Sequence, residues 1–357
     1  MTIVKIYVFT KYSSLGASSR YRTYQYLPLL GKCGIEPTVS PLFDDAYLSN
    51  KYRVGSASFG DVVRALFRRI RAIIVVPRQS SVLIEYELLP YCPAILEHWL
   101  KWRGCRLLLD YDDAIFHKYD LHRHFLVRAL LGGKIARLMR MADRVVVGNN
   151  YLAEYARRAG ASDVEVLPTV LDLRKYEQRT SSNASPYFTI GWLGSPSTAQ
   201  YLKLIQPALA QVCKQRSVRI RLIGSGPIDL ADIPAELIPW TETGEVKEIS
   251  ALDVGIMPLP DEPWARGKCG FKLIQYMACG IPVVASSVGA NTEIVSDGEQ
   301  GYLASTIEDW VEALYSLISS PELGFKMGAA GRQRVEQRYC LEVTAPRWVS
   351  MLKTLCN

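Results

Sequence analysis

The stretch RGKCGFKLIQYMACGIPVVASS, residues 266–287, places cations and glycines in front of an apolar helical pattern. Gly267 and Gly270 allow the backbone to approach a ligand closely. Lys268 and Lys272 stand just outside and just inside the expected start of the helix. Free N–H groups and the helix dipole make such a helix start a natural site for anions. The stretch therefore predicts a site for a phosphate or diphosphate group.

A second turn that leads into a helix follows at residues 289–292, with Asn291 and Thr292 at its end. A third candidate is IGWLGSPST, residues 190–198, in which a strand runs into Gly194 and Ser195 and then into a helix. Hydroxyls and helix N–H groups can hold phosphate without a charged side chain. A serine-capped helix explains the third loop equally well, so both interpretations stay open there.

The first half of the chain carries a comparable loop, KYSSLGASSRYR, at residues 11–22. It contains Gly16, Arg20 and Arg22 and leads from a strand into a helix, which favours an anion site over a capped helix with solvated arginines. The GxGxxG pattern of dinucleotide-binding proteins is absent.

Three carboxylates follow an apolar strand directly in LLLDYDDAIFHKYD, residues 107–120. Asp110, Asp112 and Asp113 at a strand end can bind a metal, orient an acceptor hydroxyl or transfer a proton. Capping of a helix by Asp112 or Asp113 is the alternative. His117 is expected to be structural.

The elements that must position these residues are short apolar strands alternating with amphipathic helices. Strands that are apolar throughout and separated by helices imply parallel sheets covered on both faces, with ligands at the carboxyl ends of the strands. The strands are predicted at residues 3–9, 82–86, 106–110, 144–148, 165–168, 187–193, 219–223, 253–257, 281–285 and 302–304. The helices are predicted near residues 20–33, 60–74, 91–103, 120–141, 150–160, 198–214, 245–251, 270–279, 307–319, 322–338 and 341–355.

A polar segment rich in serine and asparagine, residues 174–186, interrupts this alternation and predicts a linker. The alternation then restarts. We therefore predict one doubly wound α/β domain over residues 1–173 and a second over residues 187–338.

Charge is distributed unevenly along the 357 residues. Residues 1–170 hold 24 Lys and Arg against 15 Asp and Glu, whereas residues 171–357 hold 18 against 20. A basic first half suggests an anionic partner, and because no aromatic-basic motif is found, nucleic acid is not expected. The eight cysteines form no CxxC pair, and neither a secretory signal nor a membrane span is evident, which favours reduced thiols in the cytoplasm.

A basic helix is predicted near residues 60–76, where Arg64, Arg68 and Arg71 share one face opposite apolar residues. This pattern suits a helix that lies on anionic lipid. A helix that covers the sheet and exposes a solvated basic face is equally consistent with it.

The sequence FKLIQYMACGIPVVASSVGANTEIVSDGEQGYL resembles the donor-binding segment of retaining GT-B glycosyltransferases of family 4. GASSRYR, DYDDAIF, GWLGS and DVGIMPLP occur in the corresponding order in bacterial relatives that build surface polysaccharides. The resemblance implies two Rossmann-like domains facing a central cleft. The N-terminal domain would bind the acceptor, the C-terminal domain would bind a UDP- or GDP-sugar, and residues 339–357 would form a helix that crosses back to the first domain.

The resemblance also implies roles for single residues. Acceptor orientation would fall to Asp112 or Asp113, and the acceptor would be a glycan or a polyprenyl-diphosphate-linked sugar at the inner face of the cytoplasmic membrane. No metal or other cofactor is expected. The donor would be held by Gly16, Gly194 and Ser195 at the diphosphate, Gly270 and Phe271 at the sugar, Gln275 at the ribose, Asn291 and Thr292 at phosphate, and Trp240 at the base.

The chain departs from the family pattern E-x7-E, because Gly267 and Gln275 stand at its two acidic positions. Gln275 can still hydrogen-bond ribose hydroxyls. The cations that neutralise the leaving diphosphate are sought among Arg20, Arg266, Lys268 and Lys272, and their position beside glycines favours the two lysines as catalytic residues.

Three other interpretations stay open. The missing acids suggest a degenerate GT-B protein that acts as a binding subunit. A sugar-nucleotide epimerase needs titratable acids and bases around the sugar, whereas both acids of E-x7-E are missing and the four histidines of the chain all lie in its first half. Asp110-x-Asp112 could be a metal-binding DxD motif of the GT-A type, but the two-unit layout argues against that class.

Overall fold

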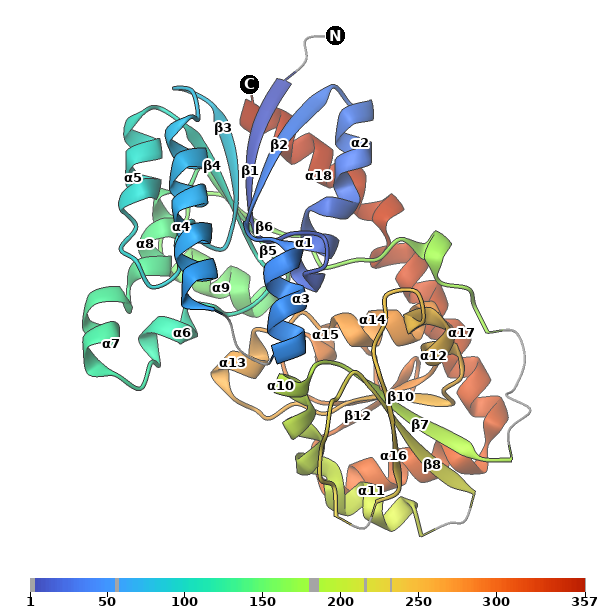
Figure 1. Cartoon of the computed structure of the whole chain (residues 1–357). Coiled ribbons are helices and arrows are strands. Elements are labelled where there is room, and N and C mark those ends of the chain that lie inside the picture. Colours follow the sequence, from blue (N-terminus) through green and yellow to red (C-terminus); the bar gives the residue numbers. More distant parts are fainter. Residues whose placement is uncertain (1–3, 55–57, 180–185, 215–216, 232, 357) are drawn as a thin grey trace. The chain divides into compact units, whose positions relative to one another are not determined.

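The computed structural model describes residues 4–54, 58–179, 186–214, 217–231 and 233–356 (Figure 1). The chain divides into two units, each with its own sheet. The first unit comprises Met1–Thr169 together with Thr344–Asn357, and the second comprises Val170–Val343. The predicted linker at residues 174–186 thus belongs to the second unit, and its residues 180–185 lie outside the described part.

The first unit contains a six-stranded parallel sheet in the order β2-β1-β3-β4-β5-β6. The middle residues of the central strands are apolar because both faces of the sheet are covered, and Val82, Leu108 and Val146 have no exposed surface. The strands are β1 Val4–Tyr12, β2 Ile35–Phe43, β3 Ser81–Glu85, β4 Arg106–Tyr111, β5 Arg144–Val147 and β6 Val164–Val166.

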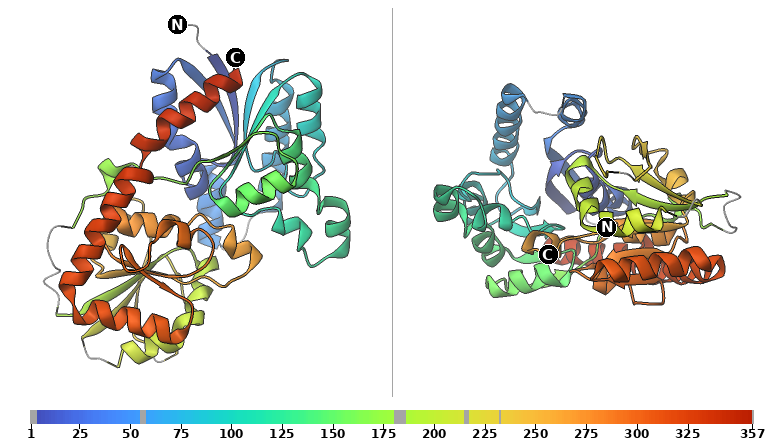
Figure 2. Two further views of the ribbon diagram at one scale, coloured as in Figure 1. Left: turned by 180° about the vertical axis from the view of Figure 1, so that it is seen from behind. Right: turned by 90° about the horizontal axis from the view of Figure 1, so that it is seen from below.

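The helices of the first unit lie on both faces of this sheet. Figure 1 shows α4 in front of the strands, and the reversed view of Figure 2 shows α18 in front of them. The helices are α1 Ala17–Arg22, α2 Leu27–Lys32, α3 Asp45–Val54, α4 Phe59–Ile74, α5 Ile95–Trp102, α6 His117–Asp120, α7 Phe125–Leu131, α8 Lys134–Met141 and α9 Asn150–Arg158, with a 3₁₀ turn at Tyr24–Tyr26.

The second unit contains a six-stranded parallel sheet in the order β12-β11-β10-β7-β8-β9. Its core gathers Trp192, Leu209, Ile220, Ile256 and Leu314. The strands are β7 Phe188–Leu193, β8 Val218–Ile223, β9 Ala235–Ile238, β10 Val254–Met257, β11 Val283–Ser286 and β12 Gly301–Ala304.

The helices of the second unit pack in pairs, α11 against α16 and α14 against α17. They are α10 Pro196–Ala199, α11 Gln206–Val212, α12 Glu245–Ser250, α13 Pro263–Arg266, α14 Phe271–Ala278, α15 Asn291–Ile294, α16 Ile307–Ser319 and α17 Pro321–Arg338, with 3₁₀ turns at Leu173–Lys175 and Gln200–Ile205. Helix α18, Leu341–Cys356, begins in the second unit and belongs to the first from Thr344 onward.

The predicted α/β fold is confirmed, and the two strands that the prediction missed, β2 and β9, lie at sheet edges. Strand β2 contains Pro37 and Pro41, which argue against a strand by pattern but are tolerated at an edge, where N–H groups need no partner. Strand β9 has four residues and includes the exposed Glu236.

The predicted helix over residues 120–141 is interrupted, because α6 ends at Asp120 and the rest of the range forms two separate helices, α7 and α8. The Gly132-Gly133 pair separates the last two. Glycine is unfavourable in the interior of a helix, which explains why the helical pattern breaks at this pair. No helix in the described ranges has both the length and the apolarity needed to cross a bilayer.

The strand order of each unit reverses at one place. In the first unit the reversal lies between β1 and β3, and in the second it lies between β7 and β10. Loops that follow the strands on either side of such a point diverge and leave room for a ligand. The carboxyl ends of these four strands are therefore where a ligand is expected.

Candidate functional site

In the second unit, the loops after β7 and β8 meet without side chains between them. A Cβ atom added to Gly224 would lie 2.4 Å from the carbonyl oxygen of Gly194. A Cβ atom on Gly194 would lie 2.5 Å from Nζ of Lys272. Glycine is required at both places, and the close approach brings Lys272 against the backbone that follows β7.

Helix α14 starts at Gly270, whose φ of 62° lies in the left-handed region that favours glycine. A Cβ atom on Gly270 would lie 2.3 Å from Cδ1 of Ile294 in α15. Gly289, before α15, has φ 54° and faces the backbone of Arg266, since a Cβ atom added to Gly289 would lie 2.6 Å from the Arg266 carbonyl oxygen. The two loops that the sequence marked as phosphate sites are thus packed on one another. Phe271 is the first residue of α14.

Lys272 lies beside these packed loops, on the first turn of α14. Its Nζ atom lies 3.5 Å from the hydroxyl of Thr198 and 4.3 Å from the centre of the Trp192 ring. Burial, followed by the charge of Lys268, lowers the pKa of Lys272 to about 7. No carboxylate in the described part of the chain forms an ion pair with Lys272. A desolvated amine with no carboxylate partner among the described residues favours the binding of an anionic ligand.

The other predicted cations of this unit are placed differently. Lys268 lies in the loop before α14, with Nζ 5.6 Å from the centre of the Trp264 ring. Arg266 is paired with Asp261 through two bonds of 2.6 and 2.9 Å. Its charge is therefore already balanced within α13 and the preceding loop, and the two lysines remain the stronger candidates.

The hydroxyl groups of the β7–α10 loop face outward. Ser195 is exposed, its carbonyl oxygen accepts from the N–H of Thr198 at 2.9 Å, and its Oγ lies 2.9 Å from Oγ of Ser197. The Ser195 side chain does not cap α10. Ser195 nevertheless occupies the N-cap position of α10 with Pro196 directly after it, as that interpretation predicts, and the phosphate site at this loop stays a prediction.

Asn291 and Thr292 fix their own loop. Asn291 is buried, and its Nδ2 donates to the carbonyl oxygen of Ser286 at 3.0 Å. Oδ1 of Asn291 is buried without a hydrogen-bond partner within the described residues. The hydroxyl of Thr292 donates to the carbonyl oxygen of Gly289 at 2.9 Å. Both side chains therefore hold the turn that brings α15 against α14.

Gln275 is buried and belongs to a polar network that the sequence did not reveal. Its Nε2 atom donates to Oε1 of Glu245 at 2.6 Å and to the hydroxyl of Tyr176 at 3.2 Å. The hydroxyl of Tyr176 donates to the same Glu245 oxygen at 3.1 Å, and the indole N–H of Trp240 donates to the other at 2.6 Å. We call Tyr176, Trp240, Glu245 and Gln275 the Glu245 network.

The Glu245 network explains the amide at position 275. A carboxylate there would lie against the buried carboxylate of Glu245, and two adjacent buried acids cannot both ionise. Glutamine supplies the donor that Glu245 needs. The chain therefore keeps one acid in this neighbourhood, but on α12 rather than on α14.

In the first unit, Gly16 precedes α1 and packs on the side chain of Tyr12, since a Cβ atom on Gly16 would lie 2.3 Å from the Tyr12 Cβ. The N–H of Arg20 donates to the Gly16 carbonyl oxygen at 2.8 Å, and the guanidinium of Arg20 lies 5.0 Å from the centre of the Tyr21 ring. Gly16 thus permits the tight turn after β1 that presents α1 at the switch point.

The three acids after β4 have separate surroundings. Asp110 is fully engaged with Arg22, which donates to both carboxylate oxygens and to the Leu167 carbonyl oxygen at 2.6 Å. Burial raises the pKa of Asp110, and the charge of Arg22 opposes that rise. Asp110 is therefore structural, and with it the DxD interpretation loses a ligand.

Asp112 lies in a second polar cluster at the switch point, which we call the Glu85 cluster: Ser18, Glu85, Tyr86 and Asp112. Ser18 donates to Asp112 at 2.7 Å and contacts Glu85 at 3.0 Å, and the hydroxyl of Tyr86 donates to Asp112. Burial, followed by the charge of Asp112, raises the pKa of Glu85 to about 7. A carboxyl group with this pKa can hold or release a proton near neutral pH.

Backbone strain coincides with the Glu85 cluster. Tyr86 follows β3 with φ 62°, a left-handed conformation that is unusual for an aromatic residue. Such outliers persist where the surrounding structure fixes them, often at functional sites. Asp113 follows Asp112 of the cluster directly, and its charge acts on Lys118. Burial, followed by the charge of Lys11, lowers the pKa of Lys118 to about 8.

The predicted site residues thus form two groups, one at the switch point of each unit. The first unit holds Gly16, Arg20, Asp112 and Asp113. The second holds Gly194, Ser195, Trp240, Lys268, Gly270, Phe271, Lys272, Gln275, Asn291 and Thr292. Glu85, Tyr86, Tyr176 and Glu245 were missed because their partners are distant in sequence. Glu85 ends β3, Tyr86 follows it, Tyr176 follows a 3₁₀ turn and Glu245 starts α12.

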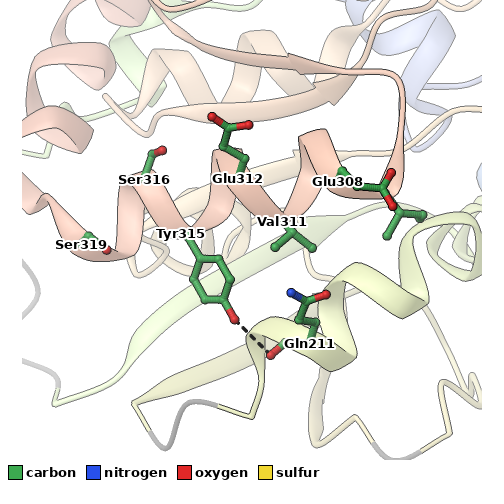
Figure 3. A pocket seen from close by; sticks show the side chains of 8 residues that line it. Gln211, Glu308, Val311, Glu312, Tyr315, Ser316 and Ser319 are labelled. Atoms are coloured by element: carbon green, nitrogen blue, oxygen red, sulfur yellow. Dashed lines mark hydrogen bonds between the residues drawn. The ribbon is translucent and has the colours of Figure 1, made fainter.

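Two pockets of the second unit lie away from these residues. One, of about 600 Å³, is lined by Gln211 of α11 and by residues of α16 such as Tyr315, whose hydroxyl donates to the Gln211 carbonyl oxygen at 3.4 Å (Figure 3). The other, of about 540 Å³, lies along α17. Neither contains a predicted site residue. Within the described residues no three His, Cys, Asp or Glu side chains are grouped to hold a metal ion.

The chain is similar to a known protein family and to several known proteins. Residues 187–320 match the family model described as glycosyl transferases group 1. Alpha-maltose-1-phosphate synthase of Mycolicibacterium smegmatis is 30% identical over 155 residues, which are 41% of this chain and 35% of that protein. GDP-mannose-dependent alpha-(1-6)-phosphatidylinositol dimannoside mannosyltransferase of Mycobacterium tuberculosis is 25% identical over 240 residues, 62% of each chain.

Solved structures show the fold over the whole chain. Sucrose-phosphate synthase from Thermosynechococcus elongatus superposes with a TM-score of 0.72 at 16% identity and covers 99% of both chains. HepE from Anabaena, in complex with UDP and glucose, superposes with a TM-score of 0.71 at 14% identity and covers 98% of this chain and 100% of that one. The chain therefore has the GT-B fold.

Proposed function

We propose, from the premise that residues 187–320 form a glycosyl transferases group 1 domain, that the chain transfers a sugar from a nucleotide-sugar donor to a hydroxyl acceptor. The donor would be a UDP- or GDP-sugar, and the acceptor a glycan or a polyprenyl-diphosphate-linked sugar in the synthesis of bacterial surface polysaccharide. The HepE complexes with UDP and UDP-glucose support a nucleotide-sugar donor. The observation that carries the proposal is the uncompensated amine of Lys272 beside the backbone of Gly194.

The leaving diphosphate gains charge as the bond to the sugar breaks. Lys272 and Lys268 would stabilise this charge together with the N–H groups and hydroxyls of the β7–α10 loop. Preorganised charges of this kind are usually the largest contribution to catalysis. Because the lysines supply the positive charge, the reaction would need no metal ion.

The acceptor would bind at the Glu85 cluster. Asp112 and Asp113 would orient its hydroxyl, and Glu85, with a pKa of about 7, would hold a proton beside them. The hydroxyl would attack on the face from which the nucleotide leaves, so that its proton passes to the departing phosphate oxygen. The sugar would then keep its anomeric configuration, as a retaining enzyme requires.

The first experiment screens UDP-, GDP- and ADP-sugars by thermal shift and then measures transfer in EDTA. We expect one class of donor to raise the melting temperature, because ligands that bind the native state stabilise it. We expect transfer to persist in EDTA and the product to keep the donor's anomeric configuration by NMR. Activity that EDTA abolishes and only a divalent ion restores would contradict the metal-free mechanism. Donor binding without any transfer would favour the alternative of a degenerate binding subunit.

The lowered pKa of Lys272 predicts proton uptake when a diphosphate binds. In the free protein at pH 8 the amine is largely neutral, since its pKa is about 7, and a bound dianion favours the charged form. We expect UDP affinity to fall about tenfold per pH unit well above pH 7. Calorimetry at pH 8 in buffers of different ionisation enthalpy measures the proton directly. Uptake that is equal in the native chain and in Lys272→Met would contradict this assignment.

Peripheral contact with the cytoplasmic face of the membrane is part of the proposal. Helix α4 exposes Arg64, Arg68 and Arg71, as predicted, but its faces are mixed. Arg69 is buried and donates to the Thr10 carbonyl oxygen, while Phe67 is exposed beside the arginines. The cations of α4 are also partly balanced, because Asp44 pairs with Arg68 and Asp61 with Arg64.

A further inference from the structure

Helix α7 of the first unit has an apolar surface that stays exposed among the described elements. Leu121, just before it, and Phe125, Leu126 and Leu130 within it are each between 59% and 71% exposed. Only Leu131 of this seven-residue helix is buried. Large side chains gathered at one place on the surface of a protein mark an interaction site rather than ordinary surface composition.

The helices on either side of α7, α6 and α8, are held in place by hydrogen bonds to Glu87. Tyr119, in α6, donates to the carboxylate of Glu87 at 2.7 and 2.8 Å. Lys134, the first residue of α8, is fully buried and bonded to Glu87 at 2.5 Å and to the Leu89 carbonyl oxygen at 2.7 Å. Figure 1 shows α7 beyond α6 and α8 at the margin of the first unit. The helix that presents the apolar side chains, α7, thus lies between two segments that are held by hydrogen bonds.

The charged residues that follow Asp120 in this part of the sequence are all cationic. Residues 121–141 contain no Asp or Glu, and besides the buried Lys134 they contain Arg123, Arg128, Arg137 and Arg140. Arg128 is held at the surface by bonds of 2.6 and 3.2 Å to the carbonyl oxygens of His122 and Arg123. Arg128 and Arg123 form no ion pair with a carboxylate of the described residues. Both arginines are exposed, close in the sequence to the exposed leucines.

We propose that α7 inserts its apolar side chains into an anionic lipid bilayer while the flanking arginines bind the headgroups. A second copy of the chain would bring identical cations together, which disfavours association through this surface. An apolar face bordered by cations fits the boundary between acyl chains and anionic headgroups. This surface is separate from that of α4, and the acid next to it, Asp120, is hydrogen-bonded to His117 at 2.9 Å.

The position of α7 relates lipid binding to the Glu85 cluster. The chain runs from Asp113 through α6 directly to α7, and α6 packs against α7. Lipid contact at α7 would therefore hold the Glu85 cluster close to the bilayer surface. This consequence rests on the proposed lipid-linked acceptor, whereas membrane binding itself does not, because it can be measured without donor or acceptor.

The test is sedimentation of the full chain with phosphatidylcholine vesicles that contain either about 30% or no phosphatidylglycerol, since the attraction to cations depends on anionic lipid. We expect binding to the anionic vesicles only, and at least a roughly tenfold loss of binding in the triple variant Phe125→Glu, Leu126→Glu, Leu130→Glu. Arg123→Glu with Arg128→Glu should weaken binding by a similar factor. The matched control is Leu204→Glu, which places the same charge on an exposed leucine of the second unit and should bind like the native chain.

A second measurement keeps the test decisive if the triple variant does not fold. Phe125→Trp should gain fluorescence quenching by brominated lipids beyond that of the native tryptophans, because its ring would enter the acyl region. Native-like vesicle binding by a folded triple variant would overturn the inference. So would an absence of added quenching, or light scattering that shows a native dimer converted to a monomer by the triple variant.

Discussion

Replacing Lys272 by methionine should lower the rate of sugar transfer by about 100- to 1000-fold while the chain remains folded, since the loss of one preorganised group that stabilises transition-state charge has effects of this size. Methionine keeps much of the side chain over the Trp192 ring, 4.3 Å from Nζ in the native chain. The removed amine is desolvated and forms no ion pair with a carboxylate of the described residues, so the melting temperature should not fall. Steady-state transfer with the donor found by thermal shift measures the effect.

Two further variants are compared with Lys272→Met to interpret its effect on the rate. Lys203→Met is the matched control, because Lys203 is exposed in the same unit and lies outside the site. Its rate should be native. Lys268→Met should also lower transfer strongly, because its charge reaches Lys272. If both Lys268→Met and Lys272→Met transfer sugar at the native rate, the lysines do not stabilise the leaving group.

Replacing Gln275 by glutamate, which restores an acid of the family pattern, should destabilise this chain by about 2–4 kcal/mol, a typical cost of removing a partner from a buried charged hydrogen bond. The new carboxylate would face Glu245, whose oxygen now accepts from Gln275 at 2.6 Å. One of the two acids would have to take up a proton, so its folded-state pKa would rise. The destabilisation should therefore be smaller at pH 5 than at pH 8.

The reciprocal exchange tests whether the pair or the position matters. Gln275→Glu combined with Glu245→Gln keeps one carboxylate and one amide in contact, and it should recover more than half of the stability that Gln275→Glu loses. Denaturant unfolding of the four proteins gives the coupling free energy. Additive losses in the double variant would show that the Glu245 network is not what fixes glutamine at position 275.

Sequence periodicity predicted the fold well because parallel strands buried on both faces are apolar throughout. It failed for β2, where Pro37 and Pro41 are tolerated only because the strand lies at an edge. It also joined α7 and α8 into one helix. No local pattern reveals that the apolar side chains of α7 stay exposed, since the covering of a helix depends on distant parts of the chain.

The site was predictable where its chemistry is local. Gly270 and Lys272 adjoin one helix start, and their types alone indicated an anion. Pairings across the fold were not predictable in this way. Asp110 was grouped with Asp112 by sequence, yet Arg22, 88 positions away, takes it into a structural ion pair. Gln275 was recognised as a departure, but its cause, Glu245, lies 30 positions away on another helix.

Helix α18 makes the first unit discontinuous, and this affects the order in which the protein can fold during synthesis. Thr344 bonds the hydroxyl of Tyr26 at 2.9 Å, the ring of Trp348 lies 5.8 Å from that of Tyr26, and Ser81 donates to the Leu355 carbonyl oxygen at 3.1 Å. During translation the first unit cannot form these contacts until the whole second unit has been synthesised. The second unit, which binds the donor in our proposal, can therefore complete its fold before the unit that precedes it in the chain.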